Sequence, residues 1–243
     1  TSKDLITWEK QGLIVPQINY EAFLRFAQTK GSINEKYLRF NQNAGIHTNH
    51  GKKVMIWDKN VVFFPRRIDG KLHFIHRIKP YIQIICVDEL SELTPEFWQN
   101  YLLQFSDYIM LSPKFKHEVS YIGGGCPPIE TKEGWLLIYH GVHDTVNGYV
   151  YCACAALMNL DNPQKEIARL PYPLFQPEHD WELNGEVNNV CFPTGVIVEN
   201  DTLYIYYGAA DERIACASVS LSALLNELLL NPNTYENQYS PKL

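Results

Sequence analysis

One pattern occurs three times in this chain: a proline, a polar turn, and then an alternating strand rich in aromatic side chains. The prolines are Pro65, Pro128 and Pro193, so the intervals between them are 63 and 65 residues. A fixed period with several short strands in each unit is typical of repeat architectures, and the β-propeller is the natural all-β candidate. We therefore predict an all-β fold of the propeller type, with short helices in its connections.

Polar side chains occupy equivalent positions of the repeats. Propeller blades surround a central channel, so equivalent positions of their innermost strands converge on one axis. Here those positions carry side chains that emerge from hydrophobic strands, namely His76, Arg77, His140, Tyr207 and Asp211. The repeat thus predicts a polar functional site near the axis.

Composition restricts the class of protein. The 243 residues are enough for one large domain, and 46% hydrophobic with 20% charged residues is ordinary for a globular chain. We interpret residues 1–243 as a single domain. A net charge of −6 argues against nucleic-acid binding, which needs a basic face. The 13% aromatic content suits a β-sheet and also suits sugar binding.

Location and metal binding follow from what the sequence lacks. No apolar run approaches the roughly 18 residues that span a bilayer, and no signal peptide is recognisable, so we expect no membrane association. The six cysteines form no metal signature, and Cys152 and Cys154 alternate along a strand. We expect free buried thiols, no metal, and no organic cofactor. Free thiols favour the cytoplasm, with the periplasm as the alternative.

Local sequence patterns predict several helices and strands. Ser2, Asp4 and Trp8 predict a compact turn with an aromatic plug, followed by an outer strand. Helical spacing at 20–29, together with residues 34–49, predicts an insertion spanning about residues 17–50. Thr94 and Ser220 begin two further helices that reach about residues 105 and 230. Strands are predicted at 60–65, 72–78, 81–87, 107–111, 135–142, 148–158, 190–198, 202–208 and 213–220.

A run of three glycines, Gly123 to Gly125, lies between two of these strands. Glycine lets the backbone approach a ligand closely, although a tight bend between strands would require it equally. The segment around His140, which is flanked by Tyr139 and Gly141, adds a second polar strand end.

Several motifs in order carry a family resemblance: GGGCPP at 123–128, GWLLIYHG at 134–141, and YYGAAD at 206–211 before a terminal helix. The strand ending in His76 and Arg77 and the opening Ser-x-Asp turn agree with them. The chain resembles the β-mannoside phosphorylases of glycoside hydrolase family 130 over nearly its whole length, apart from the insertion. This resemblance implies a five-bladed propeller that acts on β-linked mannosides, usually by phosphorolysis.

The resemblance also implies roles for individual residues. Lys59, Arg77 and His140 match the family's phosphate-binding positions. Tyr139 and Asp211 match residues that line the sugar subsite or its edge. Aromatic side chains near the axis, Tyr121 and Tyr207 among them, would bind the saccharide. Other interpretations stay open: Lys59 in a solvated turn, Asp211 capping a turn with Arg213, and one of His73 and His76 as a core histidine.

The chemistry explains why cations are needed. An inverting glycosidase uses one carboxylic acid to protonate the leaving oxygen and one carboxylate to activate water. An inverting phosphorylase needs only the acid, because phosphate itself is the nucleophile. Arg and Lys recognise phosphate well, so Lys59, Arg77 and His140 would form a cationic cradle for this co-substrate.

Two departures from the family pattern matter. The family's catalytic Asp lies in a Glu-Asp-Pro-Arg motif that these 243 residues do not contain, so the catalytic acid is unknown, and we expect it upstream of Thr1. A complete ring would need roughly 60–100 more residues, since each blade has four strands. We therefore expect the C-terminal portion of the family fold, with three to four blades. Unpaired edges would favour association, including a homo-oligomer.

Glu118, just before the glycine run, leaves the reaction type open. It is a candidate base for a β-mannoside hydrolase, and it is equally compatible with an exposed loop. Three functions therefore remain: an inverting phosphorylase, an inverting hydrolase, and a sugar-binding fragment without turnover. The first two take a disaccharide or oligosaccharide as substrate.

Overall fold

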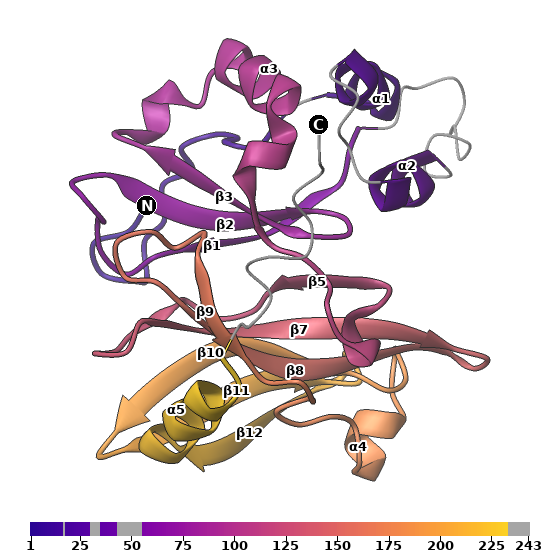
Figure 1. The fold of residues 1–243 in the computed structure, drawn as a ribbon, viewed down its shortest axis with the longest axis vertical. Coiled ribbons are helices and arrows are strands. Elements are labelled where there is room, and N and C mark those ends of the chain that lie inside the picture. Colours follow the sequence, from indigo (N-terminus) through magenta and orange to yellow (C-terminus); the bar gives the residue numbers. More distant parts are fainter. Residues whose placement is uncertain (17, 30–34, 43–54, 233–243) are drawn as a thin grey trace.

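Three antiparallel sheets are stacked in the computed structural model, with helices on one outer face and at one end (Figure 1). The structure describes residues 1–16, 18–29, 35–42 and 55–232. The first sheet has the order β1 (Asp58–Phe63), β2 (Leu72–Ile78), β3 (Ile82–Val87), β4 (Ile109–Leu111). The middle sheet has the order β5 (Tyr121–Gly124), β7 (Trp135–Thr145), β8 (Gly148–Met158), β9 (Glu166–Arg169), and β6 (Ile129–Glu130) also pairs with β7. The third sheet contains β10 (Cys191–Glu199), β11 (Thr202–Ala209) and β12 (Arg213–Ser220).

The aromatic strands of the repeat are β2, β7 and β11, the second strand of each sheet. The prediction of a mostly β chain with short helices is confirmed. The sequence patterns do not predict strands β5, β6 and β9, because all three are short and β5 contains the glycines that lower strand propensity.

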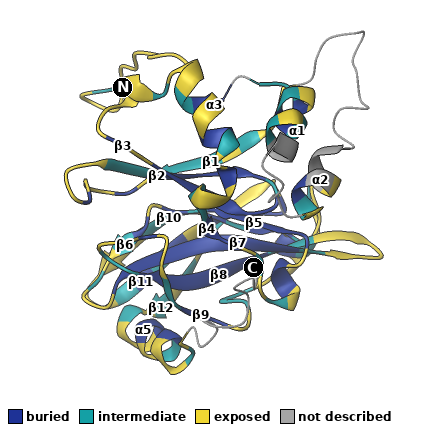
Figure 2. Ribbon diagram, turned by 45° about the horizontal axis from the view of Figure 1, so that its top comes forward, coloured by how far each residue is buried: buried dark blue, intermediate teal, exposed yellow. Residues whose placement is uncertain are grey.

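Strand β7 is buried on both faces, because it lies at the centre of the stack (Figure 2). Its odd positions, such as Trp135 and Leu137, pack with the first sheet. Its even positions, Leu136 and Ile138, pack with β11 and with α5 (Leu221–Leu230). A strand buried on both faces reads as a continuous hydrophobic run, which is what residues 135–139 show.

Helices α1 (Tyr20–Thr29), α2 (Glu35–Gln42) and α3 (Pro95–Leu103) cover the outer face of the first sheet. Short helices η1 (Leu90–Glu92), η2 (Phe105–Tyr108), η3 (Lys116–Glu118) and α4 (Asp180–Leu183) lie in other connections. Both predicted N-caps are confirmed: Thr94 Oγ1 accepts from the Phe97 amide at 3.2 Å, and Ser220 Oγ accepts from the Ala223 amide at 3.1 Å. None of the helices in the described residues is long and apolar enough to cross a bilayer.

Two expectations need correction, and the predicted insertion is described only in part. Asp4 does form the predicted turn, accepting from the amides of Ile6 and Thr7, but Trp8 is 65% exposed and no strand follows it in residues 9–16. The predicted insertion contains α1 and α2, whereas residues 17, 30–34 and 43–50 lie outside the described part. All six cysteines are free as expected, yet Cys86 and Cys216 are exposed rather than buried.

The outer face of the third sheet exposes large apolar side chains next to polar ones such as Ser218. Strand pairing places Ile197, Tyr206 and Ile214 on one face, and these side chains are 55%, 40% and 84% exposed. The opposite face of β11, with Leu203 and Ile205, is buried against the middle sheet. This sheet therefore carries apolar side chains on both faces, and the described residues cover one of them.

Candidate active site: a cationic pocket

A cavity of about 380 Å³ lies where strand ends of the three sheets meet, and we call it the cationic pocket. Its wall includes the cations of Lys59, Arg77 and Lys79, with Asp211 as the lining carboxylate. The other lining residues are Trp57, Asn60, Tyr121, Tyr151, Val187, Val190 and Phe192. The predicted residues Lys59, Arg77, Tyr121 and Asp211 are thus brought together from distant parts of the sequence.

The pairing of β1 with β2 positions the first two cations. Lys59 lies directly opposite Arg77, and a register shift follows between Lys59 and Val62. Asn60 at this bulge has a φ of 58°. A bulge redirects side chains, and here Lys59 and Asn60 both line the cavity although they are neighbours in sequence. Lys59 is exposed, as the solvated alternative held, but it lies in strand β1 and not in a turn.

A buried hydrogen-bond chain holds β1 beside β2 at this point. His76 Nδ1 lies 2.8 Å from Asp58 Oδ1, and His76 Nε2 lies 2.9 Å from the Tyr101 hydroxyl on α3. His76 is 1% exposed, which makes it a satisfied core histidine, one of the two alternatives for this position. Because Asp58 precedes Lys59 and His76 precedes Arg77, the chain of hydrogen bonds fixes the backbone that carries both cations.

Arg77 and His140 are in direct contact. Arg77 Nη1 lies 3.1 Å from His140 Nε2, and the two side chains are 6% and 0% exposed. Burial and the neighbouring Arg77 charge hold the pKa of His140 well below its ordinary value. His140 is therefore neutral near pH 7, and its Nε2 accepts the hydrogen bond from Arg77. His140 supports the pocket from behind and is absent from the lining residues, although the sequence placed it with the anion ligands.

The glycine run, Gly123 to Gly125, leaves room for the contact between Arg77 and His140. A Cβ on Gly123 would lie 2.5 Å from His140 Cε1 and 3.0 Å from Arg77 Nη1. A Cβ on Gly124 would lie 2.7 Å from Ile75, and one on Gly125 would lie 2.8 Å from the Pro193 carbonyl oxygen. The three glycines thus face all three sheets at the point where they converge. The glycines thus make room for neighbouring protein atoms, whereas the sequence analysis offered approach to a ligand or a tight bend.

Tyr121 forms a wall that two cations share. Its ring centroid lies 3.8 Å from Lys79 Nζ and 5.0 Å from Arg77 Cζ, both within range of a cation–π interaction. Its hydroxyl is hydrogen-bonded to the Tyr151 hydroxyl. Lys79 is the pocket cation that the sequence analysis missed. The signal was present, because Lys79 stands two positions beyond Arg77, directly after the strand that ends at Ile78.

Glu118 and Tyr139 belong to a different network. Glu118 is 0% exposed, so the expectation of a solvated loop residue is wrong. Its Oε1 accepts the Tyr139 hydroxyl, and its Oε2 accepts the Lys114 amide at 2.8 Å and pairs with Arg169 at 3.3 Å. Neither Glu118 nor Tyr139 is among the residues that line the cationic pocket. A carboxylate with both oxygens already bonded inside the fold is poorly placed to activate water.

The same network contains the metal-like geometry found among the described residues. Ligand atoms of His117, Glu118 and Cys154 lie within 4.8 Å of one another. The Glu118 oxygens are already bonded to Tyr139 and Arg169, whose positive charge would oppose a cation. These residues therefore suit a structural network better than a metal centre.

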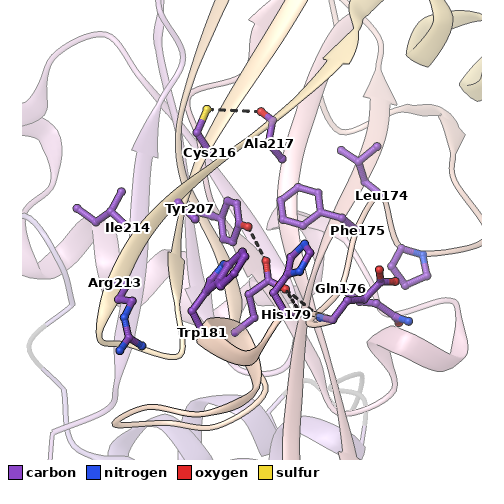
Figure 3. Close-up of a pocket in the computed structure, with 14 residues that line it drawn as sticks. Leu174, Phe175, Gln176, His179, Trp181, Tyr207, Arg213, Ile214, Cys216 and Ala217 are labelled. Atoms are coloured by element: carbon purple, nitrogen blue, oxygen red, sulfur yellow. Dashed lines mark hydrogen bonds between the residues drawn. The ribbon is translucent and has the colours of Figure 1, made fainter.

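Tyr207 lines a second cavity, of about 830 Å³, between β12 and the segment before α4 (Figure 3). Its hydroxyl donates to Glu182 Oε1 at 2.5 Å, and burial followed by the Glu182 hydrogen bond raises the pKa of Tyr207. Glu182 Oε2 also accepts the amides of Glu178 and His179. Tyr207 and Asp211, which the sequence assigned to one subsite, therefore face two different cavities.

The general acid is the part of the site that the structure does not test. The motif that carries this Asp in the family is not among these 243 residues, so the catalytic acid stays a prediction. Within the cationic pocket the described residues contribute the carboxylate of Asp211 and the three cations. Three cations and one carboxylate give the cationic pocket an excess of positive charge among the described residues.

Comparison with known proteins identifies the family of the chain. Residues 1–229 match the family described as β-1,4-mannooligosaccharide phosphorylase. The chain belongs to glycoside hydrolase family 130. The family resemblance seen in the motifs around the glycine run is confirmed.

Relatives in family 130 carry related activities. The chain is 32% identical to a 1,2-β-oligomannan phosphorylase of Thermoanaerobacter sp. over 91% of its length and 57% of the relative. It is 33% identical to a β-1,4-mannooligosaccharide phosphorylase of Ruminococcus albus over 70% of its length and 50% of the relative. The solved β-1,2-mannobiose phosphorylase of Listeria innocua, in complex with β-1,2-mannobiose, aligns with a TM-score of 0.60 at 30% identity, covering 73% of this chain and 49% of that one. The chain spans about half the length of these relatives.

Proposed function

We propose that this chain carries the phosphate-binding part of an inverting β-mannoside phosphorylase site. The observation that supports it most is the convergence of Lys59, Arg77 and Lys79 on one cavity where Asp211 is the one lining carboxylate among the described residues. A cluster of cations with so little compensating charge suits a dianion such as phosphate. The substrate class, a β-linked manno-disaccharide or oligosaccharide, follows the activities of the relatives.

The proposed chemistry uses phosphate in place of activated water. A phosphate oxygen attacks the anomeric carbon of mannose as the glycosidic bond to the leaving oxygen breaks. A carboxylic acid gives its proton to that oxygen, and inversion yields α-mannose 1-phosphate and the shortened saccharide. Lys59 and Arg77 would hold and orient the nucleophile, while neutral His140 keeps the Arg77 guanidinium in place. Tyr121 and Asp211 line the same cavity and would contact the sugar.

We propose further that the three sheets are three blades of a five-bladed propeller, with residues 1–243 belonging to one domain. The equivalent position of β2, β7 and β11 in their sheets supports this arrangement. So does the exposed apolar face with Ile197, Tyr206 and Ile214, which in a ring would pack against a neighbouring blade.

Product analysis tests the function. The protein, at high concentration, is incubated with β-1,2-mannobiose or β-1,4-mannobiose, with and without inorganic phosphate, and the products are separated by anion-exchange chromatography. We expect mannose 1-phosphate only when phosphate is present. Release of free mannose at the same rate without phosphate would establish a hydrolase instead. No product, together with no phosphate binding by calorimetry, would leave a sugar-binding fragment and overturn the proposal.

A further inference from the structure

We propose that Lys79 is a further phosphate-binding residue of the cationic pocket, with its ammonium held against the wall by the ring of Tyr121. This role rests on the proposed function, and it extends it to a residue that the family motifs did not assign. Lys79 follows the last residue of β2 directly and lines the same cavity as Arg77, two positions earlier.

The geometry keeps the Lys79 ammonium inside the pocket. Nζ lies 3.8 Å from the centroid of the Tyr121 ring, a contact that attracts the charged form. The Tyr121 ring is itself 2% exposed and fixed by its hydrogen bond to Tyr151. A long flexible side chain thus loses much of its freedom before any anion binds, and a pre-positioned cation gives up less entropy on binding.

Among the described residues, the charged side chains that line the pocket with Lys79 are mostly of its own sign. Burial, then Arg77 and Lys59, lower the pKa of Lys79 to about 8. The groups that face the cavity with it are Lys59 from β1, Arg77 from β2, Tyr121 from β5, Tyr151 from β8 and Asp211 after β11, with His140 behind them. Burial raises the pKa of Tyr121 and lowers that of His140, so both are neutral at pH 7, and Asp211 is the lining carboxylate opposite three cations among the described residues. A bound dianion relieves this repulsion.

Protonation of Lys79 then couples to anion binding. In the free protein Lys79 loses its proton as the pH rises through about 8, and the pocket loses one of three positive charges. A bound anion raises the pKa of Lys79 again, because an opposite charge favours the ammonium. Anion affinity should therefore decline above about pH 8, in a way that depends on this lysine.

Calorimetric titration of the 243-residue chain tests the role of Lys79. Inorganic phosphate is the probe at pH 7, and sulfate is the probe from pH 6.5 to 9.5, because sulfate remains a dianion over that range. We expect Lys79→Met to weaken phosphate binding by about 10- to 100-fold, the effect of one charge-assisted hydrogen bond. Lys79→Arg should keep binding at pH 7 and lose the decline in sulfate affinity above about pH 8, because Arg stays charged.

Lys71→Met is the matched control. Lys71 stands directly before the first residue of β2 and is exposed. Its Nζ lies 3.9 Å from Asp88 Oδ1. This variant should bind phosphate and sulfate like the unchanged protein. The unfolding temperature without anion shows that each variant folds, and it should rise in Lys79→Met because a repelled charge is removed.

The outcomes separate this inference from the proposed function. If the unchanged protein binds phosphate and Lys79→Met binds it equally well, Lys79 is not a ligand and only this inference fails. A decline in sulfate affinity that persists in Lys79→Arg would likewise overturn it. If the unchanged protein binds neither anion, the proposed function fails, and the inference about Lys79 fails with it.

Discussion

Arg77 on β2 and His140 on β7 are joined by a 3.1 Å contact between Nη1 and Nε2 that links the first sheet to the middle sheet. The backbone of Gly123 lies against both side chains. His140 is also directly opposite Gly123 in the pairing of β5 with β7. The geometry of the cationic pocket therefore depends on the absence of a side chain at Gly123.

Gly123→Ala should weaken phosphate binding by at least about tenfold. The new Cβ, 2.5 Å from the His140 ring, would displace His140 and Arg77 together, and overpacking of this kind costs typically about 1–3 kcal/mol. Gly195→Ala is the control, because its Cβ would meet nothing within 4 Å. Calorimetry with phosphate and urea unfolding measure the two effects. Equal phosphate affinity in both variants would show that the contact does not shape the pocket.

Glu118→Gln should lower the free energy of unfolding by about 1–3 kcal/mol, because buried Arg169 loses one of its two carboxylate partners. Phosphate binding should be unchanged, since Glu118 does not line the cationic pocket. Glu130→Gln, which removes an exposed ion pair with Arg66, serves as the control and should have little effect. Loss of a phosphate-independent release of mannose in Glu118→Gln would instead identify Glu118 as a hydrolytic base.

The stability of the chain should carry a pH signature of Lys79. Its folded pKa of about 8 lies below the ordinary 10.5, so the unfolded chain binds more protons between these values. The contribution of Lys79 to the free energy of unfolding therefore rises as the pH increases from about 8 to 10.5. The unfolding temperature of Lys79→Met should exceed that of the unchanged protein at pH 7, and the difference should shrink from pH 8 towards 10. A difference in unfolding temperature that stays constant from pH 7 to 10 would contradict the lowered pKa of Lys79.

The 243-residue chain should turn over slowly. It lacks the Glu-Asp-Pro-Arg motif of the family's general acid, and general acid catalysis typically contributes about 10²–10⁴-fold. We expect phosphate binding but far slower release of mannose 1-phosphate than from the Listeria innocua β-1,2-mannobiose phosphorylase assayed beside it. Comparable rates would mean that an acid lies within this chain, and Asp211→Asn would be the first variant to assay.

Local sequence patterns determined most of the secondary structure. Alternation and aromatic content identified β2, β7 and β11, and the Thr94 and Ser220 caps identified the start of two helices. These features depend on neighbours a few residues away, so propensity and capping suffice to predict them. The linked motifs were also enough to identify family 130, and they named Lys59, Arg77 and Asp211, which the fold brings to one cavity.

Only the tertiary structure decided which polar residues share a site. Glu118 and Tyr139 carry chemistry suited to catalysis, yet packing between η3, β7 and β9 pairs them with each other and with Arg169. Tyr207 faces another cavity because it lies on the face of β11 that turns towards Phe175 and Glu182. Whether Lys79 joins Arg77 depends on Tyr121, which lies 42 residues further along the chain. Contacts between distant segments arise when sheets stack, and the stacking determines the burial, the charge environment and thus the chemistry of each side chain.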